Sequence, residues 1–218
     1  MLSMVMLAVV MSAGAKEGEH RFDGKMSREV LENYLARAVT FSEFLHGKGS
    51  AADNLRFLTN TGTKFVGRAI YRWGGEDRLP ALIEAAQPIA RRAHEADPDL
   101  ILQAACFEIV TTGVGKLPVP EWVFREFGLP VEPRNFRYEA MLYPDGRRKD
   151  QWNKGGSVPD MSQLETRMWF LFLAASYIDL GVEAIHFGQV EIMNRNDAGN
   201  RPSWTMPPPG TWASKSTK

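Results

Sequence analysis

Two glutamates stand near the ends of apolar runs, where an ionised side chain is costly to bury. Glu108 lies in LILQAACFEIV at 100–110, and Glu191 lies in EAIHFGQVEIM at 183–193. Removing an ionised carboxylate from water without a partner is strongly unfavourable. Each glutamate is therefore expected either to pair with a cation or to face a cleft.

Two carboxyl groups that meet at one pocket are the working parts of most glycosidases. One acid with a raised pKa protonates the leaving oxygen, and a second carboxylate attacks the sugar or activates water. The separation is about 5 Å for retention and up to ~9 Å for inversion. Glu108 and Glu191 are the candidate catalytic pair, with the order of their roles left open. The alternative is that both are structural partners of Arg68 and Arg72.

Other side chains could line the same cleft and position a ligand. Residues of equal parity share one side of a strand, so Arg68 and Arg72 are expected on one face. Gln189 is expected to share a face with Glu191 for the same reason, and indole rings near carboxylates suit stacking against sugars. The candidate substrate-binding residues are Arg68, Arg72, Trp73, Glu139, Trp152, His186 and Gln189.

Each of these residues has a structural alternative. Glu139 could serve the fold, Trp73 and Trp152 could anchor core or loop, and His186 could be a hydrogen-bonded core histidine or a metal ligand. The sequence contains no H-x-x-x-H, H-E-x-x-H or EF-hand pattern, so no metal is expected. Without G-x-S-x-G, GxGxxG or P-loop patterns, a serine hydrolase is disfavoured and no nucleotide or dinucleotide cofactor is expected.

Hydrophobic periodicity predicts strands that alternate with helices. Helix caps and stops support this pattern: Ser162 and Glu165 form a capping box, and Gly181 follows the helix that they begin. The polar segment 147–160 is expected to be a long loop. Strands are expected at 64–73, 100–110, 136–142 and 183–193, and helices at 30–45, 53–60, 77–95, 120–128 and 162–181.

This alternation predicts an α/β fold with a parallel sheet, and a (β/α) TIM-type barrel is the favoured version. Ligand sites in such folds lie beyond the carboxyl ends of the strands. Eight units need roughly 200–250 residues, yet the sequence shows four good strands, with further short ones possible in 35–46 and 111–119. A smaller open sheet and an incomplete barrel that lacks its C-terminal units both fit, and we favour the second.

Composition divides the chain into three segments and limits its partners. Residues 1–19 form an apolar N-terminal segment or signal peptide without a basic n-region, which leaves secretion, the periplasm and the cytoplasm open. Residues 20–194 form the α/β domain, and residues 195–218 form an irregular tail. No membrane span is expected, because the apolar segment is too short. With 26 basic and 26 acidic residues, nucleic acid is not an expected partner.

The single cysteine, Cys106, lies inside an apolar run. It is expected to be a small buried hydrophobe, and one cysteine allows neither an intramolecular disulfide nor a cysteine-based zinc site. The sequence gives no indication of the oligomeric state.

The segments KFVGRAIYRWGGE, ILQAACFEIV, RNFRYEAMLYPDG and SVPDMSQLETRMWFLFLAASYIDLGVEAIHFGQVEIM carry a resemblance in layout to barrel-type glycoside-hydrolase-like proteins of gut bacteria. It covers roughly residues 20–194. The resemblance implies a (β/α)8 fold, a carbohydrate substrate, and catalysis by acids at strand ends, which match Glu108 and Glu191 here. The chain departs from that pattern by lacking further units after Glu191.

The leading hypothesis is a carbohydrate-active hydrolase, or a fragment of one, that uses these two glutamates. One alternative is a non-catalytic α/β domain that binds a glycan or a protein and whose glutamates are structural. Another is an α/β lyase or isomerase in which the same acids transfer protons.

Overall fold

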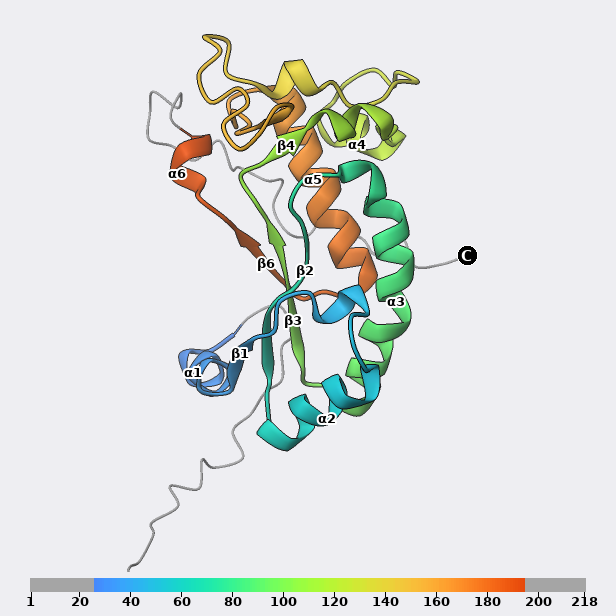
Figure 1. The fold of residues 1–218 in the computed structure, drawn as a ribbon, viewed down its shortest axis with the longest axis vertical. Coiled ribbons are helices and arrows are strands. Elements are labelled where there is room, and N and C mark those ends of the chain that lie inside the picture. The colour runs from blue at the N-terminus through green and yellow to red at the C-terminus, as the bar shows by residue number, and fades with distance from the viewer. Residues whose placement is uncertain (1–25, 195–218) are drawn as a thin grey trace, which may run out of the picture.

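The computed structural model describes residues 26–194, and in this part of the chain four strands form one parallel sheet (Figure 1). The strand order β1-β2-β3-β6 follows the chain order, and every neighbouring pair is parallel. The described sheet does not close into a barrel, because β1 and β6 each have one strand neighbour. The predicted α/β class is therefore confirmed. The four strands are β1 (Ala38–Thr40), β2 (Phe65–Arg72), β3 (Ile101–Cys106) and β6 (Ala184–Phe187).

Helices lie on both sides of the sheet but cover the two sides unequally. Helices α2, α3 and α5 lie on one side, and α1 lies on the other (Figure 1). The α-helices are α1 (Arg28–Ala36), α2 (Ala51–Thr61), α3 (Leu79–Ala96), α4 (Glu121–Glu126), α5 (Leu164–Leu180) and α6 (Val190–Met193). Four 3-10 helices occur between them: η1 (Phe44–His46), η2 (Glu76–Arg78), η3 (Thr112–Lys116) and η4 (Tyr138–Met141).

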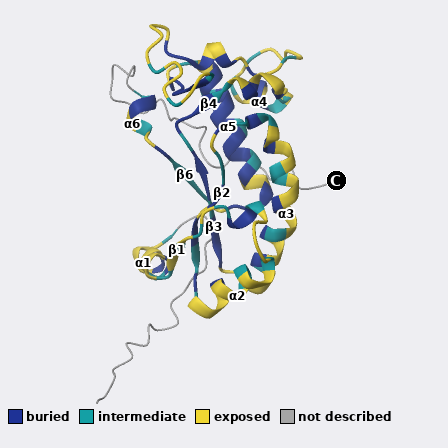
Figure 2. Cartoon of the chain, in the orientation of Figure 1, coloured by how far each residue is buried: buried dark blue, intermediate teal, exposed yellow. Residues whose placement is uncertain are grey.

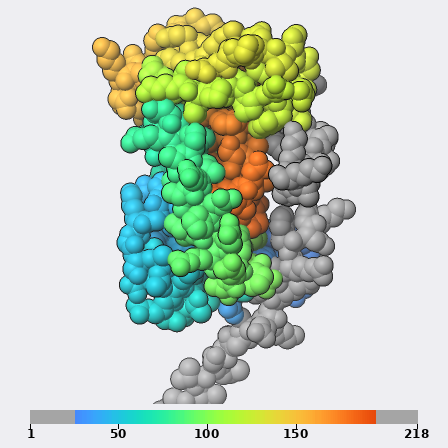
Figure 3. Space-filling view, turned by 90° about the vertical axis from the view of Figure 1, so that its right-hand side faces the viewer, coloured from blue at the N-terminus to red at the C-terminus, as the bar shows by residue number. Residues whose placement is uncertain are grey.

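The main core lies between the sheet and the helix pair α3 and α5, which run side by side (Figure 3). Helix α5 is buried over most of its surface (Figure 2), since the sheet, α3, α4 and η4 surround it. Strand residues such as Val66, Leu102 and Ala104 pack into this core. Removal of this apolar surface from water is the dominant favourable contribution to folding.

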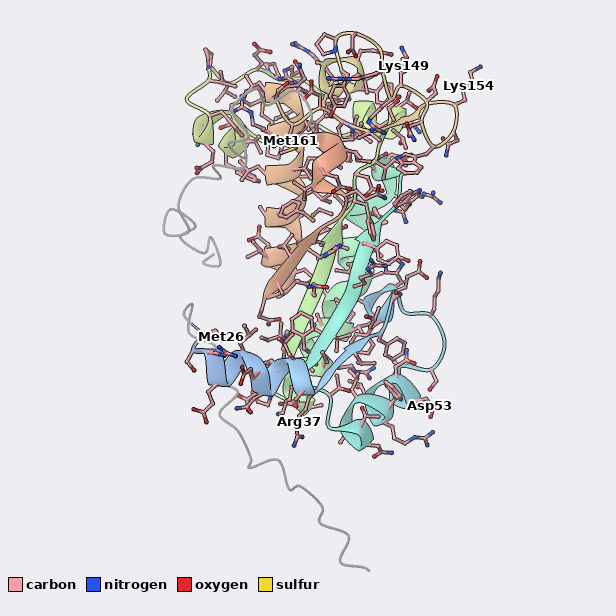
Figure 4. All side chains as sticks on the ribbon, turned by 90° about the vertical axis from the view of Figure 1, so that its left-hand side faces the viewer. Met26, Arg37, Asp53, Lys149, Lys154 and Met161 are labelled. Carbon is pink, nitrogen blue, oxygen red and sulfur yellow. The ribbon has the colours of Figure 1, made fainter. Side chains whose placement is uncertain are left out.

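On the opposite side of the sheet, the covered part lies mainly near the amino ends of the strands. There Val30 and Tyr34 of α1 pack against Ile101, and the Tyr34 hydroxyl donates to the Asp99 carbonyl at 2.8 Å. Toward the carboxyl ends of the strands, no described helix crosses this face (Figure 4). Side chains in that upper part therefore remain available for contacts other than core packing.

The segment between β3 and α5 forms a cap beyond the strand carboxyl ends (Figure 1). It contains α4, η3, η4 and a small antiparallel pair, β4 (Val110–Thr111) with β5 (Gly156–Ser157). The predicted long loop at 147–160 is confirmed apart from β5. Lys149 and Lys154 mark this end of the molecule, and Arg37 and Asp53 mark the other end (Figure 4).

Several predicted elements are confirmed, two are confirmed only in part and one is wrong. Strands β2 and β3, and helices α2, α3, α4 and α5, fall where the sequence predicts them. The predicted strand at 136–142 instead contains the helix η4, and the alternating residues Phe136, before it, and Tyr138, its first residue, are buried in the core without joining the main sheet. The predicted strand at 183–193 ends at Phe187, because Gln189 adopts a left-handed conformation (φ 40°) and α6 follows.

The predicted helix at 30–45 is divided into α1, β1 and η1. The helix ends at Ala36, and the β-branched pair Val39 and Thr40 then aligns with Val66 and Gly67 of β2. Pairing along a sheet edge here outweighs the helical spacing of the apolar residues.

The predicted segments at both ends of the chain, 1–19 and 195–218, lie outside the described residues. Within residues 26–194, no helix has both the length and the hydropathy needed to cross a bilayer. Cys106 is buried, as expected, and burial raises the pKa of its thiol.

The predicted capping box at the start of α5 is wrong, and Glu165 has a different role. The helix begins after Gln163, whose side chain makes no capping bond. Glu165 is buried and forms a two-bond ion pair with the Arg134 guanidinium at 2.7 and 2.9 Å. It also accepts a bond from the backbone nitrogen of Arg137 at 2.9 Å. This carboxylate therefore ties the cap segment to α5.

We expect Glu165→Ala to lower the free energy of unfolding by about 3 kcal/mol, because it leaves a half-buried guanidinium without its main partner. Urea denaturation followed by circular dichroism measures the change. The control is Glu121→Ala, which breaks an exposed pair with Arg125 and should cost about 0.5 kcal/mol or less. Equal losses in the two variants would contradict a structural role for Glu165.

Candidate functional site

A row of side chains crosses the sheet near the carboxyl ends of its strands. Tyr71 of β2, Ala105 of β3 and His186 of β6 are register neighbours. Phe107 follows β3 directly, and its ring centroid lies 5.2 Å from that of Tyr71 and 6.4 Å from that of His186. Parallel pairing therefore joins three strands into one continuous surface.

Two tryptophans extend this surface. The Trp73 ring lies 5.3 Å from the Phe107 ring and 5.4 Å from the Trp152 ring. Trp152 also donates from Nε1 to the backbone oxygen of Glu108 at 3.4 Å, which fixes the cap loop against the end of β3. Trp73 is 44% exposed, so a ligand could reach its ring. We call this set the aromatic surface: Tyr71, Trp73, Phe107, Trp152 and His186.

Glu108 lies beside the aromatic surface, two positions beyond the end of β3. Only 1% of its surface is exposed. Its Oε1 accepts a bond from Nε2 of Gln189 at 3.0 Å, whereas its buried Oε2 has no hydrogen-bond partner within residues 26–194. A Cβ added to Gly188 would lie 2.9 Å from Oε2, so the carboxyl group is close to the backbone that follows β6.

Burial raises the pKa of Glu108 above its ordinary value, and the nearby negative charge of Glu191 raises it further. Glu191 lies in the first turn of α6 and is exposed, rather than at the end of a strand as predicted. The structure thus brings Glu108, Gln189 and Glu191 together beyond the carboxyl ends of β3 and β6. Neither glutamate forms a salt bridge with Arg68 or Arg72 in the described residues.

Arg68 is part of the same site because β2 contains an irregularity. The register between β2 and β3 shifts between Val66 and Ile70, and Arg68 within this bulge has a φ of 55°. Its backbone nitrogen donates to Oε1 of Gln103 at 3.3 Å, and its guanidinium carbon lies 5.5 Å from the Phe107 ring centroid. Arg68 is therefore an exposed cation at the aromatic surface.

Arg72 does not share this position, so the prediction of one common face is wrong. It is in register with Cys106, whose side chain belongs to the main core. Its Nη2 donates to the carbonyl oxygens of Gly74 and Gly75, each at 3.2 Å. Arg72 thus stabilises the turn that follows β2.

Glu139 lies apart from the two candidate catalytic glutamates. It is exposed on η4 and forms an ion pair with Lys149 at 3.1 Å. Together with Tyr143 and Gln163 it lines a hollow of about 390 Å³ in the cap. The lining of this hollow includes neither Glu108 nor Glu191.

The sequence interpretation missed residues that follow β1. Glu43 pairs with Lys48, and Nδ1 of His46 lies 3.8 Å from Oε1 of Glu43. The His46 ring lies 5.6 Å from the Tyr71 ring, so this group adjoins the aromatic surface. Burial lowers the pKa of His46, which favours the neutral ring. Recognising Val39 and Thr40 as a strand would have pointed to these residues.

Within residues 26–194, no group of three or more histidine, cysteine, aspartate or glutamate side chains could hold a metal ion. His186 is half-buried, and burial lowers its pKa, with the positive charge of Arg68 adding to the effect.

Comparison of the chain with protein-family models, with curated proteins and with solved structures found no match.

We expect Glu108→Gln to raise stability at neutral pH relative to the wild type. The raised pKa means that the folded state holds this proton more tightly than the unfolded state, so wild-type stability falls as pH rises from about 4.5 through the raised value. The variant removes this loss, and the two proteins should differ little at lower pH. Urea unfolding between pH 4 and 8 tests this. Glu84→Gln on α3 is the control, and parallel curves for wild type and Glu108→Gln would contradict the interpretation.

We expect Arg68→Gly to raise the free energy of unfolding by about 1 kcal/mol, because glycine adopts a positive φ without the steric cost that arginine meets. The matched control is Arg91→Gly in the middle of α3, which should lower it by about 1 kcal/mol. Thermal or urea unfolding measures both changes. A loss of stability in Arg68→Gly similar to that in the control would show that the backbone at Arg68 is not strained.

Proposed function

We propose that the aromatic surface binds carbohydrate and that the adjoining glutamates hydrolyse a glycosidic bond. Glu108 would act as the proton donor and Glu191 as the second carboxylate, either nucleophile or base. Gln189 would position the reacting groups, and Trp73 and Trp152 would stack against sugar rings.

The observation that carries the proposal is the environment of Glu108. Its carboxyl group is buried, has a raised pKa and lies near the charge of a second glutamate, beside an aromatic surface on which Trp73 is exposed. An acid of raised pKa paired with an ionised neighbour is the electrostatic arrangement that glycoside hydrolysis requires. Structural glutamates of a core would more commonly have an arginine or lysine partner.

The proposed fold behind this site is a partial (β/α) barrel. Strands in chain order with α2, α3 and α5 on one side match the arrangement of successive barrel units. The aromatic surface then belongs to the side that faces the barrel interior, and the glutamates lie at the carboxyl ends of strands. Active sites of barrel enzymes occupy that position.

A second candidate function is carbohydrate binding without turnover. It is favoured by the 1% exposure of Glu108, because a general acid must reach the glycosidic oxygen. In this case Glu108 and Gln189 would hold α6 in place, while Trp73 and Trp152 would still stack on the ligand.

An assay of hydrolysis on a panel of glycans distinguishes the two candidate functions. The release of reducing ends measures the hydrolysis. If the enzyme proposal holds, Glu108→Gln and Glu191→Gln should each lower turnover by at least about a hundredfold while circular dichroism stays unchanged. Glu84→Gln should retain full activity, since Glu84 lies on the far side of the sheet.

The outcome that contradicts the enzyme proposal is turnover that survives both substitutions, or wild-type protein that binds glycans without cleaving any of them. In the second case, Trp73→Ala should still weaken glycan binding, which would support the binding function. A wild-type protein that neither binds nor cleaves any member of the panel would contradict both.

A further inference from the structure

Arg68 is a cation of the aromatic surface whose positive charge partly offsets the burial that raises the pKa of Glu108. The side chain is exposed, and its guanidinium forms no salt bridge within residues 26–194. It lies over the Phe107 ring at 5.5 Å, and Phe107 in turn contacts Trp73 at 5.3 Å. The Phe107 ring thus lies next to both the positive charge of Arg68 and the indole ring of Trp73.

The backbone holds Arg68 in this position at an energetic cost. Its φ of 55° lies in a region that arginine rarely adopts, and Gln103 stabilises the conformation by accepting the Arg68 N–H at 3.3 Å. A regular strand would avoid this conformation, so the bulge raises the conformational energy of the backbone at Arg68. Strained backbone of this kind is concentrated at binding and catalytic sites.

The acidic groups nearby leave room for an additional negative charge. Glu43 is paired with Lys48, and burial shifts Glu108 toward its neutral form. Glu191 is exposed, and it adjoins Glu108 on α6 at the far edge of the sheet from β1. Burial lowers the pKa of His186, and the positive charge of Arg68 lowers it further.

We infer that the carbohydrate bound at this site carries an acidic group, a uronic-acid carboxylate or a sugar sulfate, and that Arg68 is the residue that recognises it. The planar guanidinium can donate two parallel bonds to a carboxylate or sulfate. Trp73 and Phe107 would contact the apolar face of the same or the adjacent sugar unit. This inference rests on the proposed carbohydrate function and specifies its substrate class.

Matched ligands test the inference by isothermal titration calorimetry on the full chain. The acidic ligands are oligogalacturonides and sulfated carrageenan oligosaccharides, which contain no uronic acid, and the neutral partners are the carboxyl-reduced and the desulfated forms, respectively. The wild type should bind at least one acidic ligand tenfold or more tightly than its neutral partner. The carboxylate and sulfate arms identify which acidic group is recognised.

Variants then assign the selectivity to Arg68. Arg68→Gln should lower affinity for the acidic ligand at least tenfold and leave affinity for the neutral form unchanged, and Arg68→Lys should recover part of the loss. Arg91→Gln, on the opposite side of the sheet, should change neither affinity. Arg68→Gly should lose the selectivity even though it relieves the backbone strain.

The results that overturn the inference differ from those that overturn the proposed function. Wild-type protein that binds neutral and acidic forms equally, or a loss of both affinities in Arg68→Gln, would remove the acidic-ligand inference and leave carbohydrate binding intact. Selective binding without turnover would support the inference and contradict hydrolysis. Absence of binding to every ligand would contradict both.

Discussion

Parallel pairing of β3 with both β2 and β6 is the constraint on which the site depends. The register places Tyr71 and His186 on either side of Ala105, and the residues that follow each strand then meet at one edge. Because β3 is central, Phe107 and Glu108 contact groups from both neighbours. Ala105 between them is fully buried, and the Phe107 ring lies near both of the larger side chains.

The cap segment and α6 determine the surroundings of Glu108. Trp152 bonds the Glu108 carbonyl, and Gln189 bonds its carboxyl group. The second carboxyl oxygen is buried near the backbone of Gly188, and burial of the group keeps the proton on the glutamate to higher pH. The ion pair between Glu165 and Arg134 supports this arrangement from a distance, because it fixes the cap segment to α5.

Much of the fold and part of the site could be predicted from the sequence. Long periodic segments such as 64–73 and 77–95 gave the right elements because many residues contribute to each pattern. Glu108 was expected to pair with a cation or to face a cleft; in the described structure it is buried, accepts a bond from Gln189 and forms no salt bridge. Short elements failed: β1 is three residues long, and its pairing energy comes from contacts with β2 that local pattern does not encode.

Two further failures have a common physical cause. The parity rule assumed a regular strand, but the bulge in β2 separates Arg68 from Arg72, and sequence spacing carries no sign of it. Likewise Gln189 takes a left-handed conformation that ends the extended segment before Glu191. Both residues owe their positions to tertiary contacts, with Gln103 in one case and Glu108 in the other.

The most direct test of this account is the carboxyl ¹³C titration of Glu108, measured by NMR in the wild type and in Glu191→Gln. We expect Glu108 to titrate above the ordinary value of 4.5 and its pKa to fall when the neighbouring charge is removed. A Glu108 that titrates at or below 4.5, and that does not respond to the loss of Glu191, would contradict it.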